Sequence, residues 1–191
     1  MTTQLISVTR TRELAQAKAL HVVVFVLAML SFILSGLNAQ AADLRPTDYR
    51  LALADDKFAD TWQFAVVYRL RPPRRLRAQY LELAVGTIST SADNRLFVSL
   101  GPVWRLPLYN ESLFVEFGIS PTLLSGTTFN GRDMGGNFHF TSSAAIGTHF
   151  GARDAMSVSL RIQHTSNGGI SSTNPGMDMV GITFAFDLFR R

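Results

Sequence analysis

Apolar and polar residues alternate along much of the chain after residue 42. Every second residue from Leu113 to Leu123 is apolar or proline, whereas the residues between them are mostly small or polar. The same period of two recurs over 96–104, 156–162 and 180–188. Such alternation is typical of a β-strand whose two faces meet different surroundings. These stretches are therefore predicted to be strands.

Weaker alternation predicts four more strands, over 49–55, 61–70, 77–89 and 137–150. The eight strands are mostly about 9–13 residues long, which suits strands that cross a membrane at a tilt. Their polar face is rich in Gly, Ser and Thr, as expected inside a small barrel filled by its own side chains. We predict an all-β protein, an eight-stranded antiparallel up-and-down transmembrane barrel. A soluble barrel with its apolar face inward would alternate in the same way, although aromatic residues near the strand ends favour a membrane barrel.

The predicted connections between strands differ in length, and the two longest lie at 124–136 and 167–176. Bacterial outer-membrane barrels have short periplasmic turns, longer outer loops, and both chain ends on the periplasmic side. The two long connections are the fifth and the seventh, and odd-numbered connections face outward in that topology. We therefore expect the connection at 167–176 to lie outside the cell.

The N-terminal part of the chain is typical of a secretory signal. A basic stretch precedes an apolar run over 22–34, and an Ala-Gln-Ala sequence follows it. Cleavage after Ala41 or Ala42 fits equally well, and a retained membrane anchor is the alternative. The apolar run is short for a spanning helix of about 20 residues, which favours cleavage. We predict a signal peptide at 1–41 and an outer-membrane β-barrel at 42–191.

The composition excludes several classes of function. The chain has no cysteine, so disulfides, thiolate metal sites and cysteine nucleophiles are excluded together. Its formal net charge is only +4, which is mild for nucleic-acid binding, where a basic stripe with interleaved aromatic residues is usual. The densest basic cluster, over 69–77, surrounds two prolines and is interpreted as a solvated turn. Contact with lipid headgroups is the alternative for that cluster.

Three polar side chains continue the apolar faces of the last two strands to one rim of the predicted barrel. His164 and Ser166 follow Ile162 in phase, on a face where an unpaired polar group is costly. Asp178 has the same phase on the neighbouring antiparallel strand, where facing Cβ atoms lie about 4.5–5.5 Å apart and diagonal ones about 7–8 Å. A serine, an imidazole and a carboxylate are the parts of a hydrolytic triad. In it His164 would take the proton of Ser166 while Asp178 holds the ring.

The residues after the serine are candidates for an oxyanion hole. Backbone N–H groups and amide side chains of Asn167, Gly168, Gly169 and Asn174 could bind the oxyanion, an effect of about 2.7–4 kcal/mol per donor. The alternative is an ordinary Asn-Gly-Gly turn, with the three polar residues simply at the wet end of their strands.

Other chemistry-bearing residues are predicted to face the barrel interior. His139 and His149 are interpreted as interior histidines with satisfied partners. Glu116, Arg161 and Asp187 are interpreted as a buried polar network rather than a second active site.

At the candidate triad the sequence resembles the lipid A 3-O-deacylase (PagL) family. The resemblance centres on 160–170, continues through Asn174-Pro175-Gly176-Met177-Asp178, and extends backward over 135–140 and 146–151. The combination of His-x-Ser-Asn with Asn-Pro-Gly is far more specific than a lone histidine or serine.

The resemblance implies an esterase of the bacterial outer membrane that removes the 3-linked hydroxyacyl chain from the lipid A of lipopolysaccharide, without metal or cofactor. His164 matches the family's base and Ser166 its nucleophile. Asn167, Gly169 and Asn174 match residues implicated in the oxyanion hole. The family's orienting acid falls at Asp178, where glutamate is usual, so Asp178 is the least typical member.

The expected partners are the lipopolysaccharide substrate, outer-membrane lipid and the barrel-assembly machinery, with no nucleic acid. An aromatic residue near the C-terminus, Phe189, suits recognition by that machinery. Whether the protein acts as a monomer or a homodimer is left open. Two other functions are compatible with the barrel: a non-catalytic protein that binds or stabilises envelope components, and an enzyme that transfers the acyl chain to a new acceptor.

Overall fold

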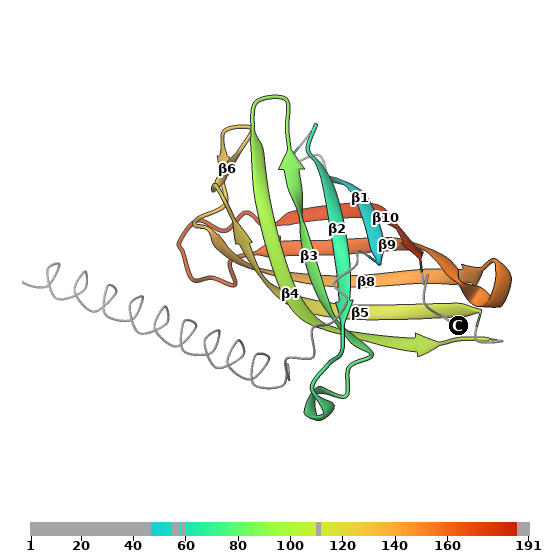
Figure 1. The fold of residues 1–191 in the computed structure, drawn as a ribbon. Coiled ribbons are helices and arrows are strands. Elements are labelled where there is room, and N and C mark those ends of the chain that lie inside the picture. The colour runs from blue at the N-terminus through green and yellow to red at the C-terminus, as the bar shows by residue number, and fades with distance from the viewer. Residues whose placement is uncertain (1–46, 55–57, 59, 110–111, 187–191) are drawn as a thin grey trace, which may run out of the picture.

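The computed structural model describes residues 47–54, 58, 60–109 and 112–186. Eight of the described strands form a closed barrel in which every neighbouring pair is antiparallel (Figure 1). The strand order around the barrel follows the chain, so the predicted up-and-down barrel is confirmed. The strands are β1 (Asp48–Ala54), β2 (Trp62–Leu70), β3 (Tyr80–Ser89), β4 (Asn94–Pro107), β5 (Leu113–Leu124), β8 (Phe138–Phe150), β9 (Met156–Ser166) and β10 (Met177–Phe186).

The predicted strand positions are confirmed, with shifts at several ends. The strand predicted over 77–89 begins at Tyr80, because a short 3-10 turn, η2 (Arg74–Leu76), precedes it and Arg77 adopts a left-handed backbone with φ of 48°. The strand predicted over 96–104 extends at both ends to 94–107. The predicted signal peptide, together with Asp187 and Phe189, lies outside the described residues.

The long connection between β5 and β8 contains a small hairpin that the alternation did not predict. It consists of β6 (Thr128–Phe129) and β7 (Arg132–Asp133), joined through Asn130 and Gly131 with φ of 48° and 74°. Two-residue strands are too short to show alternation, although Asn-Gly is a familiar hairpin turn. The side chains of Phe129 and the following Met134 are fully buried and belong to an apolar cluster.

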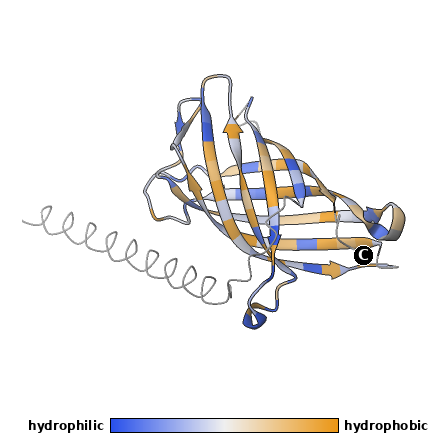
Figure 2. Ribbon diagram, viewed as in Figure 1, coloured by the Kyte–Doolittle hydropathy of each residue, from blue (hydrophilic) through white to orange (hydrophobic). Residues whose placement is uncertain are grey.

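Hydrophobic and hydrophilic residues alternate along the strands (Figure 2), and many of the large apolar ones are exposed on the outside of the barrel. Along β10, buried and exposed residues alternate without a break, and the exposed ones include Val180, Ile182 and Phe184. Leu160 and Ile162 of β9 are likewise more than half exposed, at 54% and 57%. An apolar exterior around a polar interior is expected of a barrel surrounded by lipid, and it argues against the soluble alternative. No helix within the described residues is long and apolar enough to span a membrane.

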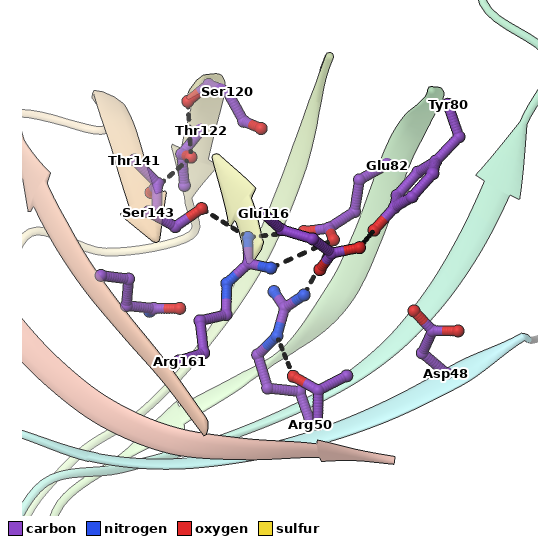
Figure 3. Close-up of polar contacts among 12 residues, drawn as sticks. Asp48, Arg50, Tyr80, Glu82, Glu116, Ser120, Thr122, Thr141, Ser143 and Arg161 are labelled. Atoms are coloured by element: carbon purple, nitrogen blue, oxygen red, sulfur yellow. Dashed lines mark hydrogen bonds and ion pairs between the residues drawn. The ribbon is translucent and has the colours of Figure 1, made fainter. Parts of the chain in front are cut away.

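Charged side chains tie the strands together across the barrel interior (Figure 3). Arg50 and Arg161 both donate to the buried Glu82 carboxylate, at 2.9 and 3.2 Å. Tyr80 and Arg105 both donate to Glu116, at 2.6 and 2.8 Å. Buried ions are tolerated only when they are paired, so these contacts constrain how the strands close around the interior.

The interior contacts confirm the predicted polar network for Glu116 and Arg161. Arg161 of β9 also donates to Ser143 of β8 at 2.6 Å, so the strand that carries His164 is fixed three residues below it. Each of the two predicted interior histidines has a polar partner, whereas the buried Nδ1 of His139 has none among the described residues. His139 is fully buried, with its Nε2 2.7 Å from the Gly136 carbonyl oxygen, and the His149 Nε2 lies 3.3 Å from the Arg105 guanidinium.

Candidate active site

The structure brings His164 and Asp178 into direct contact on the outer surface. They are opposite each other in the antiparallel pairing of β9 with β10. The His164 Nδ1 lies 2.7 Å from the Asp178 Oδ1, and the two side chains are 48% and 52% exposed. Direct opposition is the closest pairing that two strands offer, so the short aspartate side chain reaches the ring. Because Nδ1 is engaged by Asp178, Nε2 is the ring nitrogen left for another partner.

Ser166 lies two residues beyond His164, on the same face of β9 and at the end of that strand. Residues two apart on one strand face are separated by about 6.6 Å along the chain. Its side chain is half-buried, unlike the more exposed histidine. The strand stops here because Gly168 and Gly169 follow with φ of 63° and 79°, a left-handed backbone that turns the chain away. Serine, histidine and aspartate therefore lie on the same side of the sheet at one rim, as their phase predicted: the serine follows the histidine along β9, and the aspartate is opposite the histidine on β10.

Asn167 lies on the opposite, buried side of the chain from Ser166. Its side chain anchors the connection that follows. It is buried, and its amide nitrogen donates to the carbonyl oxygens of Thr173 at 2.7 Å and Met134 at 3.1 Å. Its Oδ1 accepts the Gly169 N–H at 3.0 Å. Its own N–H donates to the Asn174 Oδ1, also at 3.0 Å. Asn167 thus joins the β9–β10 connection to the β6–β7 hairpin region, which is adjacent in Figure 1.

These bonds bear on the oxyanion donors suggested by the sequence. The N–H groups of Asn167 and Gly169 already have acceptors within their own loop. In the described part of the chain, the Gly168 N–H and the Asn174 amide nitrogen make no such bond. The sequence did not reveal which donors are already bonded within the loop, because the side chain of Asn167 is held by a carbonyl 33 positions earlier in the chain.

An apolar groove of about 600 Å³ adjoins the histidine and the aspartate. It runs over the outward faces of β8, β9, β10 and β1, where Ala144, Ile162, Val180 and Leu53 contribute its apolar wall. His164 and Asp178 are part of the same lining, so a chain lying in the groove would meet the imidazole. The groove therefore combines a reactive polar end with a surface suited to a hydrocarbon.

The described residues contain no group of three or more His, Cys, Asp or Glu side chains arranged to hold a metal ion. Two further clusters of charged side chains lie inside the barrel, where arginines already neutralise Glu82 and Glu116. The candidate groups for a reaction on a molecule outside the barrel are therefore Ser166, His164 and Asp178.

The family model for lipid A 3-O-deacylase (PagL) matches residues 44–187. The lipid A deacylase PagL of Bordetella bronchiseptica is 33% identical over 95 residues, which cover 46% of this chain and 52% of that protein. The lipid A deacylase PagL of Pseudomonas aeruginosa is 27% identical over 89 residues, which cover 46% of this chain and 50% of that protein. The chain thus spans about half the length of these curated relatives.

A solved structure shares the fold. The crystal structure of the outer membrane enzyme PagL superposes with a TM-score of 0.56 at 20% identity, covering 73% of this chain and 98% of that one. The family model extends over almost the whole barrel and includes the rim that carries His164, Ser166 and Asp178. By this match the chain belongs to the lipid A 3-O-deacylase (PagL) family.

Proposed function

We propose that this protein is an outer-membrane esterase that hydrolyses the 3-O-linked acyl chain of lipid A in lipopolysaccharide. One observation carries the proposal: a histidine bonded to a carboxylate at 2.7 Å, with a serine on the same outward face, beside an apolar groove. Membership of the deacylase family supports the choice of substrate. The apolar exterior supports a barrel embedded in lipid, with the groove open to the membrane.

In the proposed reaction, His164 Nε2 removes the proton of the Ser166 hydroxyl as its Oγ attacks the ester carbonyl carbon. Asp178 holds the ring through Nδ1 and stabilises the imidazolium that forms. When the tetrahedral intermediate collapses, the imidazolium gives its proton to the departing sugar oxygen. A water molecule then attacks the acyl-serine by the same route and releases a free fatty acid. The proton transfers of both steps use only these three side chains and water.

The oxyanion that forms on the carbonyl oxygen needs hydrogen-bond donors in the β9–β10 connection. Asn167, Gly169 and Asn174 are retained in the proposal, with different tasks. Asn167 and Gly169 hold the loop in shape through their mutual bond. The Asn174 amide nitrogen and the Gly168 N–H are the donors without an acceptor in the described loop, and we assign the oxyanion to them.

The position of the groove suggests how the substrate would reach the site from the membrane. Its lining lies on the lipid-facing side of the barrel, so an acyl chain could enter sideways while the sugar headgroup stays at the rim. Long connections at 167–176 and 125–137 meet at this rim, which agrees with an outward-facing end of an outer-membrane barrel. Lipopolysaccharide occupies the outer leaflet, so substrate and site would share one side of the membrane.

Replacement of Ser166 by alanine tests the proposal. We expect Ser166→Ala to form a folded barrel that no longer removes the 3-linked acyl chain, as measured by mass spectrometry of lipid A from cells that express it. Ser172→Ala is the matched control, because Ser172 is exposed in the same connection. Unchanged deacylation by Ser166→Ala would refute the mechanism.

Mass spectrometry of lipid A, together with an assay for released free fatty acid, separates the other two functions. A non-catalytic barrel would leave lipid A unmodified even when the wild-type protein is overproduced. An acyltransferase would move the chain to a new acceptor, so the released free fatty acid would be absent.

A further inference from the structure

Gly176 is buried against the His164 ring. It precedes the first residue of β10 and has φ of +66°. A Cβ built on it would lie 2.7 Å from Cε1, 3.3 Å from Nε2 and 3.7 Å from Nδ1 of His164. These are the three nearest atoms, and all belong to the imidazole. The glycine backbone therefore covers the edge of the ring that joins its two nitrogens.

We propose that Gly176 is a positioning residue that orients the imidazole, so that Nδ1 faces Asp178 while Nε2 is directed at Ser166. The ring is nearly half exposed on its outer side, so it has few contacts there to stop it from tilting. Asp178 constrains one nitrogen only. Close approach of the Gly176 backbone supplies the second constraint, because a ring touched at Cε1 cannot tilt inward.

Whether an added Cβ would meet backbone or side-chain atoms predicts whether a glycine substitution disturbs folding or only moves a side chain. At Gly181 of β10, a Cβ would lie 2.4 Å from the backbone oxygen of Leu51 and 2.8 Å from the Cα of Ala52. A substitution there would disturb the pairing of β1 with β10, and hence barrel closure. At Gly176 the three atoms nearest to a Cβ belong to a side chain that can move outward. The barrel should therefore fold, with the ring displaced from its partners.

The experiment compares two substitutions at Gly176 with the same two at Gly131. Alanine adds a methyl group and some backbone strain, whereas asparagine accepts a left-handed backbone more readily and still adds a Cβ. Gly131 is the matched control because its φ is +74° and a Cβ there would have nothing within 4 Å. Each purified variant is assayed for kcat and KM with lipid A. Its downfield imidazole Nδ1–H resonance is recorded by NMR.

We expect Gly176→Ala and Gly176→Asn to lower kcat by about 10- to 100-fold, the scale of a misplacement of roughly 1 Å at a catalytic group. KM should change less than twofold, because the groove is intact. The Nδ1–H resonance should shift or disappear, while the heat-dependent gel mobility of the folded barrel is kept. Both Gly131 variants should behave as the wild type does in every readout.

The inference rests on the proposed function for its kinetic readout, whereas the NMR signal is independent of the substrate. If wild-type protein released no acyl chain but the resonance changed only in the Gly176 variants, the positioning role would stand and the proposed function would fail. The positioning role is overturned if the Gly176 variants keep both kcat and resonance, or if the Gly131 variants lose them equally. It is overturned too if neither Gly176 variant folds, because glycine would then be required for the left-handed backbone at this position rather than for the orientation of the ring.

Discussion

At the scale of single residues, Asp178 shows how register compensates for a short side chain. Glutamate is usual at this position in the family that the sequence resembles, so Asp178 is the least typical member of the candidate triad. Direct opposition of the two residues gives a 2.7 Å contact without the extra carbon. The identity of the acid is therefore tied to the alignment of β9 with β10.

Asp178→Asn tests whether the carboxylate charge matters at this exposed position. The amide keeps the size and an oxygen acceptor but cannot stabilise an imidazolium. We expect kcat to fall by roughly 10- to 1000-fold, less than the about 10⁴-fold seen for a buried triad carboxylate, because water screens a half-exposed pair. Steady-state kinetics on lipid A would measure it.

Asp178→Glu provides the comparison for that variant. Glutamate restores the charge but must fold back to meet a ring directly opposite, so most of the activity should remain. A charge-neutral Asp178→Asn enzyme with wild-type kcat would show that the aspartate has no part in the chemistry.

At the scale of elements, the β9–β10 connection depends on one buried side chain. Asn167 bonds to carbonyl oxygens of Met134 and Thr173 and to the N–H of Gly169. Met134 in turn lies in the apolar cluster with Phe129 of the hairpin. Loop and hairpin are thereby coupled, and the shape of the rim depends on both.

Asn167→Ala should loosen this connection without opening the barrel. The buried carbonyl oxygen of Met134 and the partly buried one of Thr173 would lose their donor, and a buried group left unsatisfied costs about 1–3 kcal/mol. We expect faster hydrogen–deuterium exchange over 167–176 and 134–135, with exchange in β9 unchanged, together with a lower kcat. Ser172→Ala is the control in the same loop. If exchange in the loop stayed at the wild-type rate, Asn167 would not be its anchor.

At the scale of the whole molecule, the interior ion pairs hold strands that are distant around the barrel. Glu82 of β3 accepts from Arg50 of β1 and from Arg161 of β9, and all three side chains are buried. The same strand, β9, carries the catalytic candidates on its other face. The interior ion pairs therefore help to hold the strand that carries His164 and Ser166 on its outer face.

Glu82→Gln should destabilise the barrel strongly. It removes the charge that compensates two buried guanidinium groups, and breaking a buried pair typically costs about 3–5 kcal/mol. Urea unfolding followed by tryptophan fluorescence should show a lower free energy of unfolding. Asp93→Asn, which weakens a partly exposed pair with Arg95, should change it by less than about 1 kcal/mol. Equal stability of the Glu82→Gln and wild-type barrels would mean that the network contributes little.

The alternation along the chain is enough to predict which residues share a face, since a strand alternates with a period of two wherever it is placed. Eight strands and the common phase of His164, Ser166 and Asp178 follow from that local rule, whereas the outward direction of the apolar face was decided by closure of the barrel. Tertiary structure alone decided which residues meet across strands. Pairing register set Asp178 opposite His164, and folding of distant loops brought Met134 to Asn167. The contact of Gly176 with the imidazole belongs to the same class, because it depends on how the chain enters β10.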